Sequence, residues 1–213
     1  VTRALAILGL LADSAEPLGV RELARRMRVA PSNVQRLMTT LARFGFLEQA
    51  ELTKRYGIGY RAFQVGSAFV GQSSIYSAVM PELYELANQH ITGFLGVRRE
   101  RSIVYLATVQ SEGPVALTHR PGSQTYLHST AMGKALLAEM TEHEVRALLG
   151  ERPLPRLTDH TRISLQQLLG DLAEVRRLGY ATSEEENRHG FYSAGAVVRD
   201  ASGAAAGVIS GAV

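Results

Sequence analysis

The spacing of hydrophobic residues over the first 45 positions is that of short helices. Apolar residues recur at intervals of three and four in three stretches that are separated by proline-containing breaks, and these stretches are residues 3–12, 20–29 and 31–43. When successive residues of the third stretch are placed 100° apart, one side gathers Val34, Leu37, Met38 and Leu41. The pattern predicts three short helices in succession.

A small β-hairpin is predicted after the third helix, which ends at Gly45. Two short runs with the alternation of strands are joined by a polar turn, and they occupy residues 46–49 and 55–58. Helical spacing resumes at residues 61–73, which we interpret as a linker helix between two domains.

The remainder of the chain predicts a mixed α+β domain. Helical spacing occurs at 75–89, 130–140, 142–149 and 164–180, and Gly179 ends the last of these helices. Runs typical of antiparallel strands occupy residues 94–97, 101–109, 115–119, 191–200 and 204–213, with a hairpin turn at 200–203. We therefore expect a first domain at residues 1–60, a linker helix within 61–74 and a second domain at 75–213.

Positive charge is concentrated in the first of these domains. The net charge is only +3, but residues 1–61 contain 10 Lys and Arg against 5 Asp and Glu, while residues 62–213 contain 13 against 15. A basic first segment is typical of a module that binds a polyanion. The chain has no cysteine, which excludes disulfides and thiolate metal sites, and no apolar run reaches the roughly 18 residues that span a bilayer. We expect a cytoplasmic protein without membrane association.

The polar side of the third predicted helix has the chemistry that reads DNA. It contains only hydrogen-bonding side chains and no carboxylate, and these are Ser32, Asn33, Gln35, Arg36, Thr39 and Thr40. Arginine can bind guanine, asparagine and glutamine can bind adenine, and hydroxyls can hold phosphates. Further candidate contacts are Arg21 on the preceding helix and, at the hairpin, Lys54, Arg55 and Tyr56. The segment as a whole predicts a winged helix-turn-helix that binds double-stranded DNA.

Motifs for catalysis or cofactor binding fail on spacing. The Gly-Lys pair at Gly133 has His128 where a phosphate loop needs glycine, and "GIGYRAFQVG" has the wrong third spacing for a dinucleotide fold. The histidines show no metal-binding spacing, so we expect no catalytic residues, metal or cofactor, with only His128 as a candidate polar contact or metal ligand. The three carboxylates of Glu184–Glu186 are interpreted as a solvated loop or edge.

The sequence resembles the isocitrate lyase regulator (IclR) family of bacterial transcription factors. The resemblance rests on "RALAILGLLADSAEPLGVRELARRMRVAPSNVQRLMTTLARFGFLEQ", "RYGIGYRAFQVG", "VYLATVQS", "LHSTAMGKALLAEM", "LGYATSEEEN" and "GAVVRDASGAAAGVIS", which follow one another in the expected order from residue 3 to residue 210. It implies an N-terminal winged helix-turn-helix, a linker helix that helps dimerisation and a C-terminal GAF/PAS-like domain that binds a small effector.

The resemblance also implies a pocket for an organic acid. In such proteins backbone amides at the start of the helix written here as "TAMGKALL" hold the acidic end, and residues on later strands assist; the corresponding positions are Ala131, Met132, Gly133, Ser183, Ser193 and Ser210. A helix N-terminus supplies free N–H groups and a positive dipole end for such a carboxylate. This chain has serine at position 183, where an acidic residue can stand, and Ala212 in place of a hydroxyl. We therefore expect an aromatic or medium-sized acid as effector.

We expect a homodimer, and further a dimer of dimers, because one recognition helix covers too few base pairs for specific binding and twofold symmetry reads a palindrome. We also expect it to repress catabolic genes. A competing hypothesis is a small-molecule sensor or enzyme whose winged helix only binds another protein. Compared with the family, the chain is a few residues short near Gly93 and stops early at Val213. We expect a loop near Gly93 and C-terminal residues to be missing from the sequence.

Overall fold

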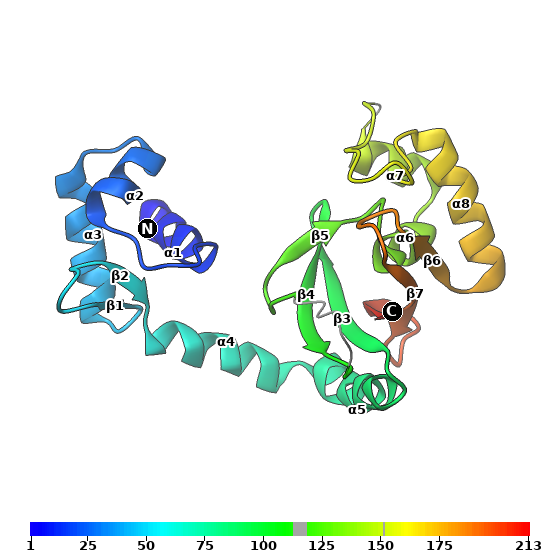
Figure 1. The fold of residues 1–213 in the computed structure, drawn as a ribbon, viewed down its shortest axis with the longest axis horizontal. Coiled ribbons are helices and arrows are strands. Elements are labelled where there is room, and N and C mark those ends of the chain that lie inside the picture. The colour runs from blue at the N-terminus through cyan, green and yellow to red at the C-terminus, as the bar shows by residue number, and fades with distance from the viewer. Residues whose placement is uncertain (113–118, 151) are drawn as a thin grey trace. The chain divides into compact units, whose positions relative to one another are not determined.

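The computed structural model describes residues 1–112, 119–150 and 152–213. The chain divides into two units, Val1–Gln72 and Ser73–Val213, which we call unit 1 and unit 2 (Figure 1). No helix among the described residues is both long and apolar enough to cross a membrane.

Unit 1 has the helices and the hairpin that its hydrophobic pattern predicts. Its elements are α1 (Thr2–Ala12), α2 (Val20–Met27), α3 (Pro31–Arg43), β1 (Leu47–Gln49), β2 (Tyr56–Ile58) and α4 (Tyr60–Gln72). The two strands pair antiparallel, and an isolated bridge joins Leu18 to Tyr56. One core includes residues from α1, α2, α3 and the hairpin, namely Ile7, Leu11, Leu18, Leu23, Ala24, Val34, Met38, Leu47 and Tyr56. Burial of this apolar face holds α3 in place and leaves its polar side exposed.

The turn between α2 and α3 is three residues long, the spacing of a helix-turn-helix. Arg28 ends α2 in the left-handed conformation, with φ of 54°, and the Val29 amide donates back to the Ala24 carbonyl. Pro31 occupies the first turn of α3, where its lack of an N–H costs nothing. The winged helix-turn-helix arrangement expected from the sequence is confirmed.

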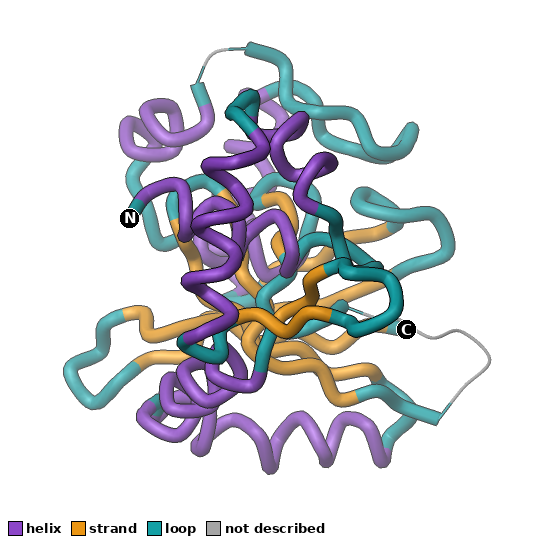
Figure 2. The backbone as a smooth tube through the Cα atoms, turned by 90° about the vertical axis from the view of Figure 1, so that its left-hand side faces the viewer, coloured by secondary structure: helices purple, strands orange, loops and turns teal. Residues whose placement is uncertain are grey.

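Unit 2 is built on an antiparallel sheet. Its elements are α5 (Ser74–Asn88), β3 (Thr92–Arg99), β4 (Ser102–Val109), β5 (Gln124–Tyr126), α6 (Ala131–Ala138), α7 (Glu142–Leu149), α8 (Leu165–Leu178), β6 (Ala181–Glu184), β7 (Tyr192–Arg199) and β8 (Ala205–Ala212). Within the described residues six strands pair in the order β5-β4-β3-β8-β7-β6. Residues 152–164 form a long loop between α7 and α8 (Figure 2).

The sheet carries separate clusters of buried residues with different helices. One contains Val79 and Leu83 of α5 together with Leu95 of β3, and the other contains Phe94 of β3 and Met132 of α6. Because neighbouring residues of a strand point to opposite faces, Phe94 and Leu95 belong to different clusters. Helix α6 is buried along its whole length, between the sheet and α8. Its N-terminus is thereby fixed against the strands.

The strands of unit 2 differ from the sequence-based expectations in one detail. The short strand β5 was not expected, and the strand expected at 115–119 lies, except for His119, outside the described residues. Gly93 lies within β3 and pairs with Val109 and Gly211, and the expectation that residues are missing near it stays a prediction. Glycine favours the close packing there, because a Cβ would make a tight contact 3.2 Å from the Leu83 Cα.

Candidate functional site

The polar side of α3 is exposed as the sequence predicts. Val34 and Met38 are fully buried, whereas the six polar residues named above, Ser32, Asn33, Gln35, Arg36, Thr39 and Thr40, are all exposed. Within the described residues the side chains of Ser32, Asn33 and Arg36 make no hydrogen bond or ion pair, while the Thr40 hydroxyl donates to the Arg36 carbonyl at 2.9 Å. The helix therefore presents unengaged donors and acceptors to solvent.

Gln35 is held in place by its neighbours. Its Nε2 donates to the Thr39 hydroxyl at 3.1 Å and to the Tyr56 hydroxyl at 3.2 Å. Tyr56 is only 3% exposed and belongs to the core of unit 1, so little of it is open to a partner, and its contact with DNA stays a prediction. Its ring is needed for packing, and its hydroxyl instead orients Gln35.

The basic residues around α3 differ in whether their side chains already have partners within the chain. Lys54 is exposed in the turn between β1 and β2, where its backbone is left-handed with φ of 54°. Arg21 is exposed on α2. Arg55 is exposed but donates from Nη1 to the Pro17 carbonyl at 3.0 Å. Its Nη1 also lies 3.9 Å from a carboxylate oxygen of Glu22. Lys54 and Arg21 can thus turn towards a phosphate without breaking a side-chain hydrogen bond or ion pair within the described residues, whereas Arg55 has two such contacts to give up.

A cavity of about 170 Å³ lies in unit 2 at the N-terminus of α6. Strands β3, β4, β7 and β8 and the segment after β6 contribute to its wall. The lining residues are Phe94, Tyr105, His119, Thr130, Ala131, Met132, Ser183, Asn187, Arg188, Phe191, Ser193, Ser210 and Ala212. A dry cavity of roughly 150 Å³ is known to hold benzene, so this one has room for a single ring.

The structure brings together five of the six predicted pocket residues: Ala131, Met132, Ser183, Ser193 and Ser210. Gly133 does not line the cavity, and its part in effector binding stays a prediction. Its amide donates to the Thr130 hydroxyl at 3.1 Å, which caps the helix. A Cβ at position 133 would lie 2.1 Å from the Leu127 carbonyl oxygen, so Gly133 permits a close backbone crossing.

Two amides at the start of α6 remain available to a ligand. Within the described residues, neither the Ala131 nor the Met132 N–H donates a hydrogen bond. Gly195 of β7 allows the sheet to approach them, because a Cβ there would lie 3.1 Å from the Met132 nitrogen. These unpaired donors and the positive end of the helix dipole favour an anion in the cavity.

An aromatic wall faces this anion site. Tyr105 and His119 are stacked with ring centroids 4.4 Å apart, and Phe94 lies 5.5 Å from Tyr105. Burial raises the pKa of Tyr105 to about 12, partly offset by a hydrogen bond with Thr125, so its phenol stays protonated. Burial, and secondarily the charge of Arg188, lowers the pKa of His119 below 6.5. Near pH 7 the wall is neutral.

Sequence reasoning missed the cationic residue of this cavity. Arg188, in the irregular segment between β6 and β7, lines the cavity and lies with its guanidinium carbon 4.9 Å from the centroid of the Phe191 ring. Asn187 precedes it and accepts a hydrogen bond from Ser129 at 3.0 Å. Asn187 ends the stretch "LGYATSEEEN" of the family resemblance, but the irregular segment that holds both residues leaves no periodic signal that would place them in a cavity.

Two other polar groups proved to be structural. Glu186 is 5% exposed, so the interpretation of Glu184–Glu186 as solvated is wrong for this residue. Its carboxylate pairs with the buried ammonium of Lys134 at 2.5 Å. His128 is 2% exposed and its Nε2 lies 2.9 Å from the Pro155 carbonyl oxygen, which makes it a packed histidine with a backbone partner.

Comparison with known proteins identifies both units of the chain. Residues 1–51 match the model of the IclR helix-turn-helix domain, and residues 68–213 match that of the bacterial transcriptional regulator IclR C-terminal domain. The chain is 35% identical to the HTH-type transcriptional regulator BhcR of Paracoccus denitrificans over 98% of this chain and 75% of that protein. It is 29% identical to the transcriptional repressor IclR of Escherichia coli over 94% of this chain and 74% of that protein.

A solved structure extends the agreement in fold. An IclR homologue from Microbacterium hydrocarbonoxydans, complexed with 4-hydroxybenzoate, superposes with a TM-score of 0.84 at 16% identity, covering 99% of this chain and 86% of that one. The C-terminal family match alone spans well over half of the sequence. The chain therefore belongs to the IclR family of bacterial transcriptional regulators.

Proposed function

We propose that this protein is a dimeric repressor that binds palindromic DNA through α3 and the β1–β2 hairpin and changes its DNA affinity when an aromatic carboxylic acid enters the unit 2 cavity. The observation that carries the proposal is the composition of that cavity. Free amides of Ala131 and Met132 lie in the same cavity as the aromatic wall of Phe94, Tyr105 and His119.

The cavity matches both ends of such a ligand. A carboxylate would accept hydrogen bonds from the two amides, and the exposed Arg188 supplies a countercharge. The ring would stack on neutral aromatic side chains, for which offset or edge-on contact is favourable. The protonated Tyr105 phenol and the Ser193 and Ser210 hydroxyls offer partners for a polar ring substituent.

The ligand of one relative supports the aromatic class. The Microbacterium homologue is complexed with 4-hydroxybenzoate, and its fold is that of this chain. A two-carbon acid would leave most of the 170 Å³ cavity empty and its aromatic wall uncovered. We therefore take benzoate and 4-hydroxybenzoate as the first probes.

Titration calorimetry of the full chain tests this ligand class. We expect benzoates to bind at least about tenfold more tightly than glyoxylate, and Arg188→Gln to weaken benzoate binding about tenfold, since a hydrogen bond to a charged group contributes about 1.5–3 kcal/mol. Arg156→Gln removes an equally exposed arginine that does not line the cavity and serves as control. Tighter binding of glyoxylate than of any benzoate would contradict the proposal.

The alternative of a protein-interaction winged helix fits the surface less well. An interaction module would be expected to expose apolar side chains. Here the exposed residues of α3 are polar except for Pro31 in its first turn, and Val34 and Met38 are turned into the core. The polar surface favours DNA as the partner, and a DNA-bound regulator of this kind would work in the cytoplasm without catalysis.

A further inference from the structure

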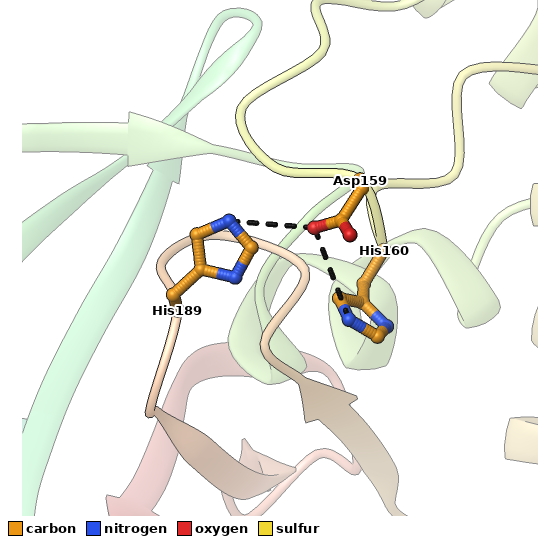
Figure 3. A group of neighbouring side chains, drawn as sticks. All are labelled: Asp159, His160 and His189. Carbon is orange, nitrogen blue, oxygen red and sulfur yellow. Dashed lines mark ion pairs between the residues drawn. The ribbon is translucent and has the colours of Figure 1, made fainter.

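Two histidines and an aspartate meet outside the ligand cavity of unit 2. Asp159 and His160 lie in the loop between α7 and α8, and His189 lies between β6 and β7 (Figure 3). One potential ligand atom from each residue lies within 4.8 Å of the other two. Figure 3 shows both imidazoles directed to the same carboxylate oxygen.

The separations are close to those of a metal coordination shell. His189 Nε2 lies 3.3 Å and His160 Nε2 lies 3.8 Å from Asp159 Oδ1. Zinc bonds of about 2.0–2.2 Å in tetrahedral geometry place neighbouring ligand atoms about 3.3 Å apart. Small side-chain rotations would therefore bring all three atoms onto one ion. Two imidazoles with one carboxylate are a donor set that suits divalent first-row metals.

The backbone that carries these ligands is already fixed. The buried hydroxyls of Thr158 and Thr161 donate to the carbonyls of Glu185 and Glu186 at 2.8 and 2.7 Å, which ties the two loops together. A metal would thus bind to a frame that needs little ordering, which reduces the entropic cost of binding.

Glu185 adds charge beside the cluster. Its Oε1 accepts from the Gly190 amide at 2.7 Å, and its Oε2 lies 3.4 Å from His160 Nε2. With Asp159 this makes two negative charges next to two imidazoles, enough to neutralise one divalent cation. Exposure of the three ligands, 75% for the Asp159 side chain and 53% and 64% for the two histidines, leaves room for water on the ion.

We propose that Asp159, His160 and His189 form a binding site for one divalent transition-metal ion of the zinc class, with the fourth position open to water. The ion would join the α7–α8 loop to the segment between β6 and β7. The three ligands come from two separate parts of the sequence without a recognisable spacing, so only the fold reveals the site.

Zinc titration of the tag-free, chelator-treated full chain tests the site. We expect one Zn²⁺ per chain, with affinity reduced more than about tenfold by Asp159→Asn or His189→Ala, because each removes a direct ligand. His143→Ala is the matched control, since His143 is an exposed histidine on α7 outside the cluster. Bound Co²⁺ should give the intense visible absorption of a tetrahedral site in the wild type and lose it in both ligand variants.

Equal Zn²⁺ affinity in the wild type and in His189→Ala, or no binding against a competing chelator, would overturn the proposal. The thermal midpoint without metal serves as the folding control, and the ligand variants should match the wild type because the altered side chains are exposed. Any stabilisation by Zn²⁺ should then be confined to the wild type and His143→Ala.

A consequence for the ligand cavity rests on the proposed function. His189 directly follows Arg188, which lines the cavity, so a metal that fixes this segment also restricts Arg188. We expect Zn²⁺ to tighten benzoate binding in the wild type and not in His189→Ala. Zinc binding without this change would refute the coupling alone, whereas a chain that binds zinc but no benzoate would count against the proposed function.

Discussion

Lys134 and Glu186 form an ion pair whose side chains are only 5% and 6% exposed. Removing one partner of such a pair leaves an uncompensated buried charge. We expect Lys134→Ala to lower the free energy of unfolding by about 3–5 kcal/mol in a urea titration. Truncating the exposed Arg177 of the Arg177–Glu174 pair should change the free energy of unfolding far less, because solvent screens an exposed ion pair.

A double variant separates the charge from the packing. Lys134→Met combined with Glu186→Leu removes both charges and keeps most of the volume, so it should be more stable than Lys134→Ala. If the double variant were as unstable as the single one, the loss would come from packing and the electrostatic explanation would fail.

His128 makes stability depend on pH. Burial lowers its pKa below 6.5, opposed in part by the hydrogen bond to Pro155, so the folded chain holds the neutral ring. Below pH 6.5 His128 binds a proton in the unfolded chain but stays neutral in the folded chain. The free energy of unfolding therefore falls with falling pH, until the pH drops below the lower pKa of His128 in the folded chain. The free energy of unfolding should therefore drop below pH 6.5, and less so in His128→Gln. If the free energy of unfolding of His128→Gln depended on pH as steeply as that of the wild type, other groups would cause the effect. His119 would be the first candidate, because its pKa is also lowered.

At the scale of elements, α3 and the β1–β2 hairpin should contribute to DNA binding in different ways. Arg36 lies on the exposed polar side of α3 and Lys54 in the hairpin turn. We expect Arg36→Ala to relax sequence preference at one base, at a cost of about 1–3 kcal/mol on specific DNA, and Lys54→Ala to weaken binding on all DNA and lower the salt slope by about one.

Binding isotherms on specific and random duplexes at several salt concentrations measure both effects. Arg156→Ala removes the same charge in unit 2 and should leave DNA binding unchanged. Equal losses for Arg36→Ala and Lys54→Ala on both duplexes would show that the two residues do not have separate roles.

The sequence predicts those features of the fold that depend on neighbouring residues, and it does not predict those that depend on contacts between residues far apart in the sequence. Helical spacing and a glycine that ends a helix are patterns of neighbouring residues, so the sequence alone reveals them. Helix α8 indeed ends before Gly179, which has the left-handed conformation. The inward packing of Tyr56 was not predicted, because a basic hairpin pattern does not indicate that this ring enters the core. Which residues line the cavity depends on the pairing of strands that are far apart in the sequence. The sequence analysis therefore did not predict Phe94, Tyr105 and His119 as cavity residues. The pocket residues found from sequence came from the family resemblance.

For the whole molecule, α4 is the candidate contact between copies of the chain. None of its residues is buried within the chain, and it exposes large hydrophobic side chains at Tyr60, Phe63, Val65 and Phe69. Such side chains are stabilised when a second copy covers them. We expect light scattering to find dimers or larger species for the wild type and a shift towards monomer for Phe63→Ser with Phe69→Ser. If the double variant had the same molar mass in solution as the wild type, the contact between copies would lie outside α4.

If the proposed function is right, DNA binding in unit 1 responds to an aromatic acid bound in unit 2. The direct measurement is fluorescence anisotropy of the full chain on a duplex enriched from a randomised DNA pool, with and without 4-hydroxybenzoate. We expect the selection to enrich a palindromic sequence that the protein binds more tightly than random DNA. Adding the acid should change that affinity, because a ligand that prefers one arrangement of the protein shifts the equilibrium between arrangements. No enrichment over random DNA, or an affinity that the acid and other benzoates leave unchanged, would contradict the proposed function.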